Sequence, residues 1–267
     1  MKRITIDEIV SKKKRKKKIT ALSTYDYPFA KLVDESLIDI VLVGDSVGMV
    51  CLGYETTLPV TMDDMIHHTK AVTRAAKRSL VVGDMPYGSY QDSSELAYWN
   101  ARRFTREAGA QAVKLEGGER VIDQVTTLVQ SGIPVMGHVG MTPQSIREFG
   151  GYHVQGRTKK EANQILKDAV MLEEAGAFSV VLECIPSTLA TRITRKLRIP
   201  TIGIGAGVHV DGQILVLHDI LGFESGKKLR FVRQYANLDR EIRAAIQGFR
   251  NDVLQSKFPA PKEGYRG

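Results

Sequence analysis

Short apolar runs that stop at turn residues recur along the chain and predict β-strands. Most are rich in Val, Ile and Leu without the alternation of a half-exposed strand. Such continuous runs indicate strands covered on both faces, which is typical of a parallel sheet. The eight runs span residues 18–24, 40–45, 79–86, 112–118, 133–140, 178–185, 199–207 and 212–222.

Segments with apolar residues three and four positions apart lie between most of these runs and predict helices. They include "MDDMIHHTKAVTRAAKR", "SSELAYWNARRFTREAG", "ERVIDQVTTLVQSG", "TKKEANQILKDAVMLEEAG" and "STLATRITRKL". Eight strands alternating with helices predict an α/β fold, the (β/α)8 TIM barrel. The main alternative is an open doubly wound sheet, which normally has fewer strands and a glycine-rich turn after the first one. Here the first strand leads into "TYDYPFAKLVDES", which has no glycine.

A length of 267 residues fits one barrel domain spanning residues 1–267. A helical extension, at about residues 232–254, is expected to pack below the barrel or on a neighbouring subunit. Two connections, residues 46–61 and 141–157, are too long to be simple turns. Both follow the carboxyl ends of strands, where barrel enzymes build their active sites, so we expect lids or binding loops there.

Composition is that of an ordinary soluble globular protein, with 43% hydrophobic and 25% charged residues. No run approaches 18 apolar residues and "MKRITIDEIV" lacks the features of a signal peptide, so we expect a cytoplasmic protein without a membrane partner. Seven of the net eight positive charges lie in one run, Lys12–Lys18. Without interleaved aromatics or a recognition motif, such a run is usually a solvated helix end or turn, and we expect no nucleic-acid partner.

Four of the apolar runs deliver an acid at or near their carboxyl end: Asp45, Asp84, Glu116 and Glu183. In a barrel these ends open onto one mouth, so acids distant in sequence converge there. Several carboxylates in one cleft repel one another unless a cation or a proton neutralises them. Oxygen ligands with little nitrogen or sulfur favour a hard ion such as Mg²⁺.

Side-chain alternation along a strand adds two further groups to the predicted mouth. Lys114 points to the same side as Glu116, and His138 to the same side as Met136. An open alternative is that each acid caps the helix that follows it. Lys114 is compatible with a Schiff-base lysine, a partner for Glu116 or an anchor for a substrate carboxylate.

Other candidates are weaker. His67 and His68 are adjacent on a predicted helix, where their side chains diverge by about 100°, so a surface or packing role is expected. The turn "GIGAG", residues 203–207, is compatible with an anion site or with tight packing. Cys51 and Cys184 lack the spacing of a metal site, and alternation turns Cys184 away from the mouth.

The sequence resembles the ketopantoate hydroxymethyltransferase family over nearly its whole length. The match runs through "TYDYPFAKLVDE", "VLVGDSVGMVCLGYETTLPVTMDDMIHHT", "VVGDMPYGSYQ", "AVKLEGG", "GHVGMTPQS", "VLECIP" and "PTIGIGAG" followed by "DGQILVLHD". The resemblance implies a (β/α)8 barrel, a bound Mg²⁺, a 5,10-methylenetetrahydrofolate co-substrate, a 2-oxo acid substrate, a role in pantothenate synthesis and a homodecamer.

The matched motifs also imply roles for individual residues. By this resemblance Asp45, Asp84 and Glu116 form the metal site, Asp45, Ser46, Asp84, Lys114 and His138 contact substrate, and Glu183 is the catalytic proton acceptor. The implied reaction is a metal-assisted aldol-type transfer. Its rivals are a Mg²⁺-dependent lyase for a 2-oxo acid, an aldolase that uses Lys114 as a Schiff base, and a non-catalytic module that binds through Lys12–Lys18.

Overall fold

The chain divides into two compact units, Met1–Val216 and Leu217–Gly267. The structure, a computed structural model, describes residues 2–223 and 229–265. The first unit contains every predicted site residue. The second begins directly after the last strand of the sheet.

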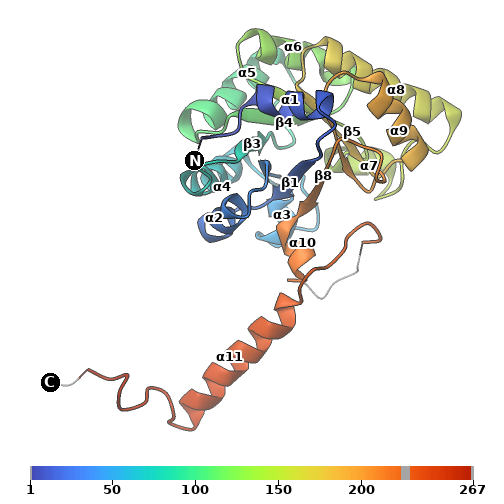
Figure 1. Ribbon diagram of the computed structural model, residues 1–267. Helices are drawn as coiled ribbons and strands as arrows, with labels where there is room; N and C mark the ends of the chain where they lie inside the picture. Colours follow the sequence, from blue (N-terminus) through green and yellow to red (C-terminus); the bar gives the residue numbers. More distant parts are fainter. Residues whose placement is uncertain (1, 224–228, 266–267) are drawn as a thin grey trace. The chain divides into compact units, whose positions relative to one another are not determined.

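Among the described residues, eight parallel strands form a closed barrel in chain order (Figure 1). The strand that closes the barrel pairs with the first one, from Ile19 opposite Gly212 to Ser23 opposite Val216. The predicted TIM barrel is therefore confirmed. Its strands are β1 (Ile19–Ser23), β2 (Ile40–Val43), β3 (Leu80–Asp84), β4 (Ala112–Glu116), β5 (Val135–Gly140), β6 (Ser179–Glu183), β7 (Thr201–Ile204) and β8 (Gly212–Val216).

Helices occupy every connection from β1 to β7, as the spacing of apolar residues predicts for most of them, whereas residues 205–211 join β7 to β8 without a helix. Thr61 and Thr158 each begin a helix through a capping box, with Asp64 and Glu161 as the reciprocal partners. The helical elements are α1 (Ile6–Lys14), α2 (Tyr27–Glu35), α3 (Val47–Val50), α4 (Met62–Ala75), α5 (Ser94–Arg102), η1 (Arg103–Glu107), η2 (Glu119–Val121), α6 (Ile122–Gln130), η3 (Pro143–Ser145), α7 (Ile146–Phe149), α8 (Lys159–Glu174), α9 (Ser187–Lys196), α10 (Leu217–Leu221) and α11 (Leu238–Leu254).

The interior of the barrel is apolar where the strands begin. Side chains from the first halves of the strands form one buried cluster, which α1 closes by inserting the fully buried Ile9. Met136 belongs to this cluster, whereas His138, two residues further along β5, lies beyond it among polar groups. The interior thus changes from hydrocarbon to charge along the strand direction.

The basic run is held against the start of the barrel more closely than the expected solvated turn. Lys12 Nζ lies 2.5 Å from Asp39 Oδ1, and Lys13 Nζ lies 2.9 Å from Asp211 Oδ2. Lys18 donates to the carbonyl of Val210. Asp39 and Asp211 immediately precede β2 and β8, so these lysines neutralise acids at strand starts, while Lys14 to Lys17 are exposed.

The structure contradicts one further prediction, the end of the eighth strand, and agrees with another, the roles of His67 and His68. The eighth apolar run was expected to be strand to residue 222, which is wrong, because the strand ends at Val216 and the chain continues as α10. Leu217, Ile220 and Leu221 have helical spacing, which the apolar run obscured. His68 Nδ1 lies 2.8 Å from the carbonyl oxygen of Tyr25 and His67 is exposed, as expected for a packing role.

The second unit contains α11, which overlaps the predicted helix at 232–254. None of the residues of α11 is buried. Ile242, Ile246, Phe249 and Val253 recur at helical spacing and form an exposed apolar stripe, with Ile246 63% exposed. No helix in the described part of the chain is long and apolar enough to cross a membrane.

Asp34 joins α2 to the start of β3. Its two carboxylate oxygens accept hydrogen bonds from the backbone N–H groups of Lys77, Arg78 and Ser79, at 2.7 to 3.2 Å. Burial acts to raise the pKa of Asp34, but these hydrogen bonds outweigh it and lower that pKa below its ordinary value. The ionised carboxylate therefore stabilises the fold.

We predict that Asp34→Asn lowers the free energy of unfolding by about 1–3 kcal/mol at pH 7, because an amide nitrogen then faces backbone donors. Since the folded-state pKa is depressed, the contribution of Asp34 is present above its unfolded-state value and is lost as the pH falls through the folded-state value. Urea denaturation of both proteins should therefore give midpoints that converge below about pH 4. Glu35→Gln, at an exposed position on α2, is the control; a constant difference at all pH values would contradict the prediction.

Candidate active site

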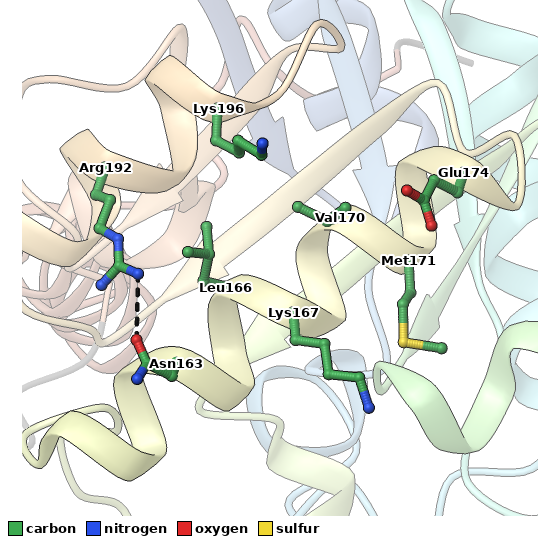
Figure 2. A pocket seen from close by; sticks show the side chains of 8 residues that line it. All are labelled: Asn163, Leu166, Lys167, Val170, Met171, Glu174, Arg192 and Lys196. Carbon is green, nitrogen blue, oxygen red and sulfur yellow. Dashed lines mark hydrogen bonds between the residues drawn. The ribbon is translucent and has the colours of Figure 1, made fainter.

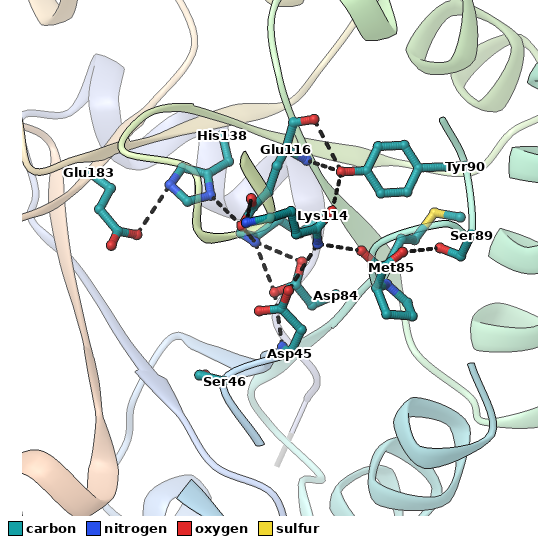
Figure 3. Close-up of polar contacts among 12 residues, drawn as sticks. Asp45, Ser46, Asp84, Met85, Ser89, Tyr90, Lys114, Glu116, His138 and Glu183 are labelled. Atoms are coloured by element: carbon teal, nitrogen blue, oxygen red, sulfur yellow. Dashed lines mark hydrogen bonds and ion pairs between the residues drawn. The ribbon is translucent and has the colours of Figure 1, made fainter. Parts of the chain in front are cut away.

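The carboxyl ends of β2 to β6 bring the predicted residues into one cluster (Figure 3). Strand register places Asp84 beside Lys114, and Glu116 beside His138. Glu183 follows on β6, and Asp45 follows β2. The cluster consists of Asp45, Asp84, Lys114, Glu116, His138 and Glu183, of which all but Glu183 are buried.

Lys114 is the buried cation at the centre of this cluster. Its Nζ lies 2.7 and 2.8 Å from the two carboxylate oxygens of Asp84 and 3.4 Å from Glu116 Oε1. Burial acts to lower the pKa of Lys114, but the charges of Asp84, Glu116 and Asp45 outweigh it and raise that pKa. Lys114 is therefore positively charged at neutral pH.

The two aspartates lie side by side. The backbone N–H of Asp45 is 3.2 Å from Asp84 Oδ2. Burial, followed by the charges of Asp84 and Glu116, raises the pKa of Asp45 well above its ordinary value. The pKa of Asp84 is also raised by burial, although Lys114 opposes the shift. The cluster thus holds more buried negative charge than Lys114 alone neutralises.

A second row of contacts runs from Glu116 through His138 to Glu183. His138 Nδ1 lies 3.2 Å from Glu116 Oε1, and His138 Nε2 lies 3.2 Å from Glu183 Oε2. Burial and Lys114 act to lower the pKa of His138, but the two carboxylates raise it to about 9. Burial acts to raise the pKa of Glu116, and Lys114 and His138 lower it instead. His138 is therefore an imidazolium between two carboxylates at neutral pH.

The two long connections meet beside this cluster. Ser46 Oγ, at the start of the first, lies 2.8 Å from the hydroxyl oxygen of Tyr25. The connection contains α3, and Met49 Sδ lies 3.6 Å from the hydroxyl of Tyr152 in the other connection. Residues 141–157 are tied to the end of β6 where the N–H of Met141 donates to the carbonyl of Glu183. The predicted loops thus contact each other and adjoin the site residues.

A groove on the outside of the barrel lies between α8 and α9 (Figure 2). Its volume is about 460 Å³. Apolar side chains of Leu166, Val170 and Met171 are bordered by Lys167, Arg192 and Lys196. The groove shares no residue with the charged cluster.

The family model for ketopantoate hydroxymethyltransferase matches residues 3–261. A protein from Heliobacterium modesticaldum named 3-methyl-2-oxobutanoate hydroxymethyltransferase is 52% identical over 264 residues, which cover 99% of this chain and 96% of its own. A protein of the same name from Syntrophus aciditrophicus is 54% identical over 258 residues, covering 97% and 95%. The chain belongs to the ketopantoate hydroxymethyltransferase family. It is therefore a transferase.

Solved structures with the same fold share much less of their sequence with this ketopantoate hydroxymethyltransferase family member. A 2,3-dimethylmalate lyase of the PEP mutase/isocitrate lyase superfamily superimposes with a TM-score of 0.61 at 13% identity, covering 97% of this chain and 92% of its own. A phosphonopyruvate hydrolase in complex with oxalate and Mg²⁺ gives 0.60 at 12% identity, covering 97% and 93%. At such identities the likeness concerns the fold alone.

Two acids of this ketopantoate hydroxymethyltransferase family member, Asp45 and Asp84, are suitable ligands for a hard cation. In the residues that the structure describes, no three His, Cys, Asp or Glu side chains are grouped to hold a metal ion. Asp45 and Asp84 nevertheless supply neighbouring buried carboxylates with excess negative charge, which suits Mg²⁺. Both oxygens of Glu116 already accept contacts, from Lys114, His138 and the N–H of Gln144. Direct metal binding by Glu116 would require it to release one of them. Metal binding by Asp84 would likewise displace a contact, because both of its oxygens accept from Lys114 and Oδ2 also accepts from the N–H of Asp45.

Cys184 does not offer a reactive thiolate. The residue has a left-handed backbone with φ of 46° and is half-buried next to Glu183. Burial, and then the charge of Glu183, raises the pKa of the thiol to about 12. Cys184 is therefore a protonated thiol at neutral pH, which is a poor nucleophile.

Sequence reasoning overlooked two residues of the cluster, Gln144 and Tyr90. The side chain of Gln144 donates to Asp45 Oδ2 at 2.9 Å and accepts from the hydroxyl of Tyr90 at 2.7 Å. Neither residue carries a charge, so the search for acids at strand ends did not select them. The available signal was their position within the matched segments "GHVGMTPQS" and "VVGDMPYGSYQ".

Close packing behind β3 positions Asp84. The ring of Phe104, in the single π-helical turn η1, covers Gly83 so closely that a Cβ there would lie 2.2 Å from Phe104 Cδ1. The main chain of β3 therefore lies directly on the ring, and the following residue is aimed into the barrel.

We predict that Gly83→Ala lowers the free energy of unfolding by about 1–3 kcal/mol, because the methyl group must displace Phe104. Phe104→Leu makes room for that methyl group, so the double variant should be more stable than the sum of the two single changes indicates. Urea denaturation of the four proteins of this cycle gives the coupling. Strict additivity would show that the contact does not govern the packing behind Asp84.

Proposed function

We propose that the chain catalyses hydroxymethyl transfer to C3 of 3-methyl-2-oxobutanoate, in which 5,10-methylenetetrahydrofolate supplies the one-carbon unit and water supplies the hydroxyl oxygen, giving 2-dehydropantoate and tetrahydrofolate in pantothenate biosynthesis. Family membership supports the reaction class. The observation that carries the proposal is the buried row from Asp84 through Lys114, Glu116 and His138 to Glu183, which sets paired acids beside a candidate base. The small 2-oxo acid would bind at this mouth.

In this proposal Asp45 and Asp84 would hold Mg²⁺, with Glu116 as the third acid of the site. The ion, when bound, supplies a Lewis acid that polarises the carbonyl of the 2-oxo acid. Mn²⁺ and Co²⁺ share the preference for such donors closely enough to serve as probes.

Glu183 would take the proton from C3 of 3-methyl-2-oxobutanoate. As the least buried acid of the cluster, it is the one most accessible to a substrate entering the mouth. His138 Nε2 lies 3.2 Å from Glu183 Oε2, so the imidazole orients the carboxylate that acts as general base in this proposal. After the transfer, the same pair of residues would hold the abstracted proton away from Asp45 and Asp84.

Lys114 and Ser46 would orient the 2-oxo acid. The three hydrogens of Lys114 Nζ are directed to Asp84 and Glu116, so binding of a substrate carboxylate requires Lys114 to exchange one of these contacts. Ser46 lies beside Asp45 and is linked to Tyr25. The connection 141–157, with Tyr152 near Met49, is the proposed water-excluding or folate-contacting element.

We predict that the protein forms 2-dehydropantoate only when Mg²⁺, 3-methyl-2-oxobutanoate and 5,10-methylenetetrahydrofolate are all present, and that EDTA stops the reaction. Asp84→Asn should reduce the rate at least about a hundredfold, because it removes a charge that acts directly at the reacting centre. Product formation is followed by chromatography, and circular dichroism verifies that the variant is folded. Asp123→Asn, at an exposed acid of α6, is the control.

The outcomes of this assay separate the rival functions. Consumption of a 2-oxo acid without folate would indicate a lyase, and borohydride trapping of substrate on Lys114 would indicate a Schiff-base aldolase. A metal-replete protein that makes no 2-dehydropantoate would refute the proposed function.

We further propose a cytoplasmic homo-oligomer, a decamer as the family resemblance implies, which binds small molecules and neither nucleic acid nor membrane. The exposed apolar stripe of α11 supports an assembly, because such a stripe on a helix without buried residues is typical of an interface. The use of Lys12, Lys13 and Lys18 in contacts with the barrel supports a structural role for the basic run.

We predict that Ile246→Asp lowers the molar mass of the assembly in solution, because a carboxylate would be buried in an apolar contact. Light scattering coupled to gel filtration measures the mass. Asn251→Asp, on the opposite face of α11, introduces the same charge and should leave the mass unchanged. An unchanged mass for Ile246→Asp would exclude the stripe from the interface.

A further inference from the structure

Every hydrogen-bonding position of the Gln144 side chain is occupied. Gln144 lies in η3 (Pro143–Ser145) and is 5% exposed. Its amide nitrogen donates to Asp45 Oδ2 and to the carbonyl of Met85, both at 2.9 Å. Its amide oxygen accepts from the Tyr90 hydroxyl at 2.7 Å and from Gln91 Nε2 at 3.1 Å. A buried glutamine with this many partners is held in one orientation.

The partners also decide which way the amide faces. A flipped amide would place its oxygen against the carbonyl oxygen of Met85, which can only accept a hydrogen bond. It would also place its nitrogen against the amide nitrogen of Gln91. The observed orientation is therefore the one that presents a donor to Asp45.

Tyr90 holds Gln144 from the other side. The Tyr90 hydroxyl is fully buried and accepts a hydrogen bond from the backbone N–H of Glu116 at 3.1 Å. Two acceptors lie near the hydrogen of this hydroxyl, the amide oxygen of Gln144 at 2.7 Å and the carbonyl of Glu116 at 3.1 Å, and the shorter contact directs it to Gln144. The backbone N–H of Gln144 donates to Glu116 Oε2 at 3.0 Å. Gln144 is thereby locked to the end of β4 as well as to Asp45.

The two carboxylate oxygens of Asp45 therefore differ in their hydrogen bonding. Oδ2 is held by Gln144, whereas Oδ1 accepts no hydrogen bond from any residue within 2–223 and 229–265. Asp45 is buried and its charge is opposed by Asp84 and Glu116, so without Gln144 its carboxyl group would have no side-chain donor to fix it. Because Gln144 fixes the position of Oδ2, the direction of Oδ1 is fixed as well.

We infer that Gln144 is a positioning residue, which orients Asp45 so that Oδ1 is presented to the divalent cation, and that Tyr90 acts through Gln144. The inference rests on the proposed function, in which Asp45 and Asp84 hold that cation. It assigns the start of the connection 141–157 a part in cation binding, separate from any contact with the 2-oxo acid or the folate.

The test is direct titration of the metal-free full-length protein with Mn²⁺, with unbound Mn²⁺ measured by electron paramagnetic resonance. Gln144→Met keeps the length of the side chain and removes its polar atoms. We expect it to weaken Mn²⁺ binding about 10- to 100-fold, the usual effect of losing a partner that orients a metal ligand. This readout does not depend on turnover.

Gln124→Met is the matched control. Gln124 is also a buried glutamine, 7% exposed, but its amide donates at 3.3 Å to the carbonyl of Gln91, and its side chain hydrogen-bonds to no acid in the described part of the chain. We expect its Mn²⁺ affinity to stay within about twofold of the wild type. Equal weakening in Gln124→Met and Gln144→Met would overturn the inference, because the effect would then be a general loss of packing.

Tyr90→Phe provides a second, smaller change if Gln144→Met does not fold. It removes one hydroxyl and should weaken Mn²⁺ binding about fivefold. Where both variants fold, the double variant should bind no more weakly than Gln144→Met alone, since Tyr90 acts through Gln144.

Wild-type affinity separates failure of this inference from failure of the proposed function. If the wild type binds Mn²⁺ and the Gln144 and Tyr90 variants bind it equally well, the inference is overturned and the proposed function stands. If the wild type binds no Mn²⁺, the proposed metal dependence fails and the inference fails with it.

Discussion

The charge of one buried ammonium group underlies the arrangement of the whole mouth. Lys114 contacts Asp84 and Glu116 directly and lowers the electrostatic cost of Asp45 nearby. Burying carboxylates without a compensating cation is strongly unfavourable. The lysine that β4 supplies therefore compensates much of the negative charge of the three buried acids at the strand ends.

The compensation of charge by Lys114 is incomplete. A second cation, His138, neutralises Glu116 and Glu183 at one end of the row, where its imidazole contacts both carboxylates. At the other end Asp45 has a polar neutral partner, the amide of Gln144, and no positively charged contact of comparable closeness. The site is thus polarised, with the deficit of positive charge concentrated at Asp45.

Patterns along the sequence predicted the barrel and its charged residues well, for identifiable physical reasons. Continuous apolar runs mark strands buried on both faces, and the acids stand out because charge is rare at such strand ends. The contribution of Gln144 was not predictable in this way, since it depends on the exact path of a connection. The end of β8 was misplaced because Leu217, Ile220 and Leu221 extend an apolar run into a helix. Likewise, the basic run reveals its acidic partners Asp39 and Asp211 only once the strand starts are assembled.

Two layers of side chains fill the interior of the barrel, an apolar layer that stabilises the fold and a charged layer at the mouth. Near the strand starts, Ile9 of α1 and the first side chains of each strand form a hydrocarbon core. Two or four residues later, the same strands present Lys114, Glu116 and His138. Substitutions at the mouth can therefore alter chemistry while the hydrocarbon layer continues to hold the strands in register.

The ion pair between Lys13 and Asp211 joins residues 198 positions apart. During synthesis on a ribosome, α1 and β1 emerge long before β8, which supplies the only strand able to cover the second edge of β1 within the described barrel. Until then β1 remains an open edge, and such edges pair readily with other chains. The nascent protein therefore passes through a prolonged stage in which closure is incomplete, and its yield in a cell would depend on how well chaperones shield that edge until residue 216 has left the exit tunnel.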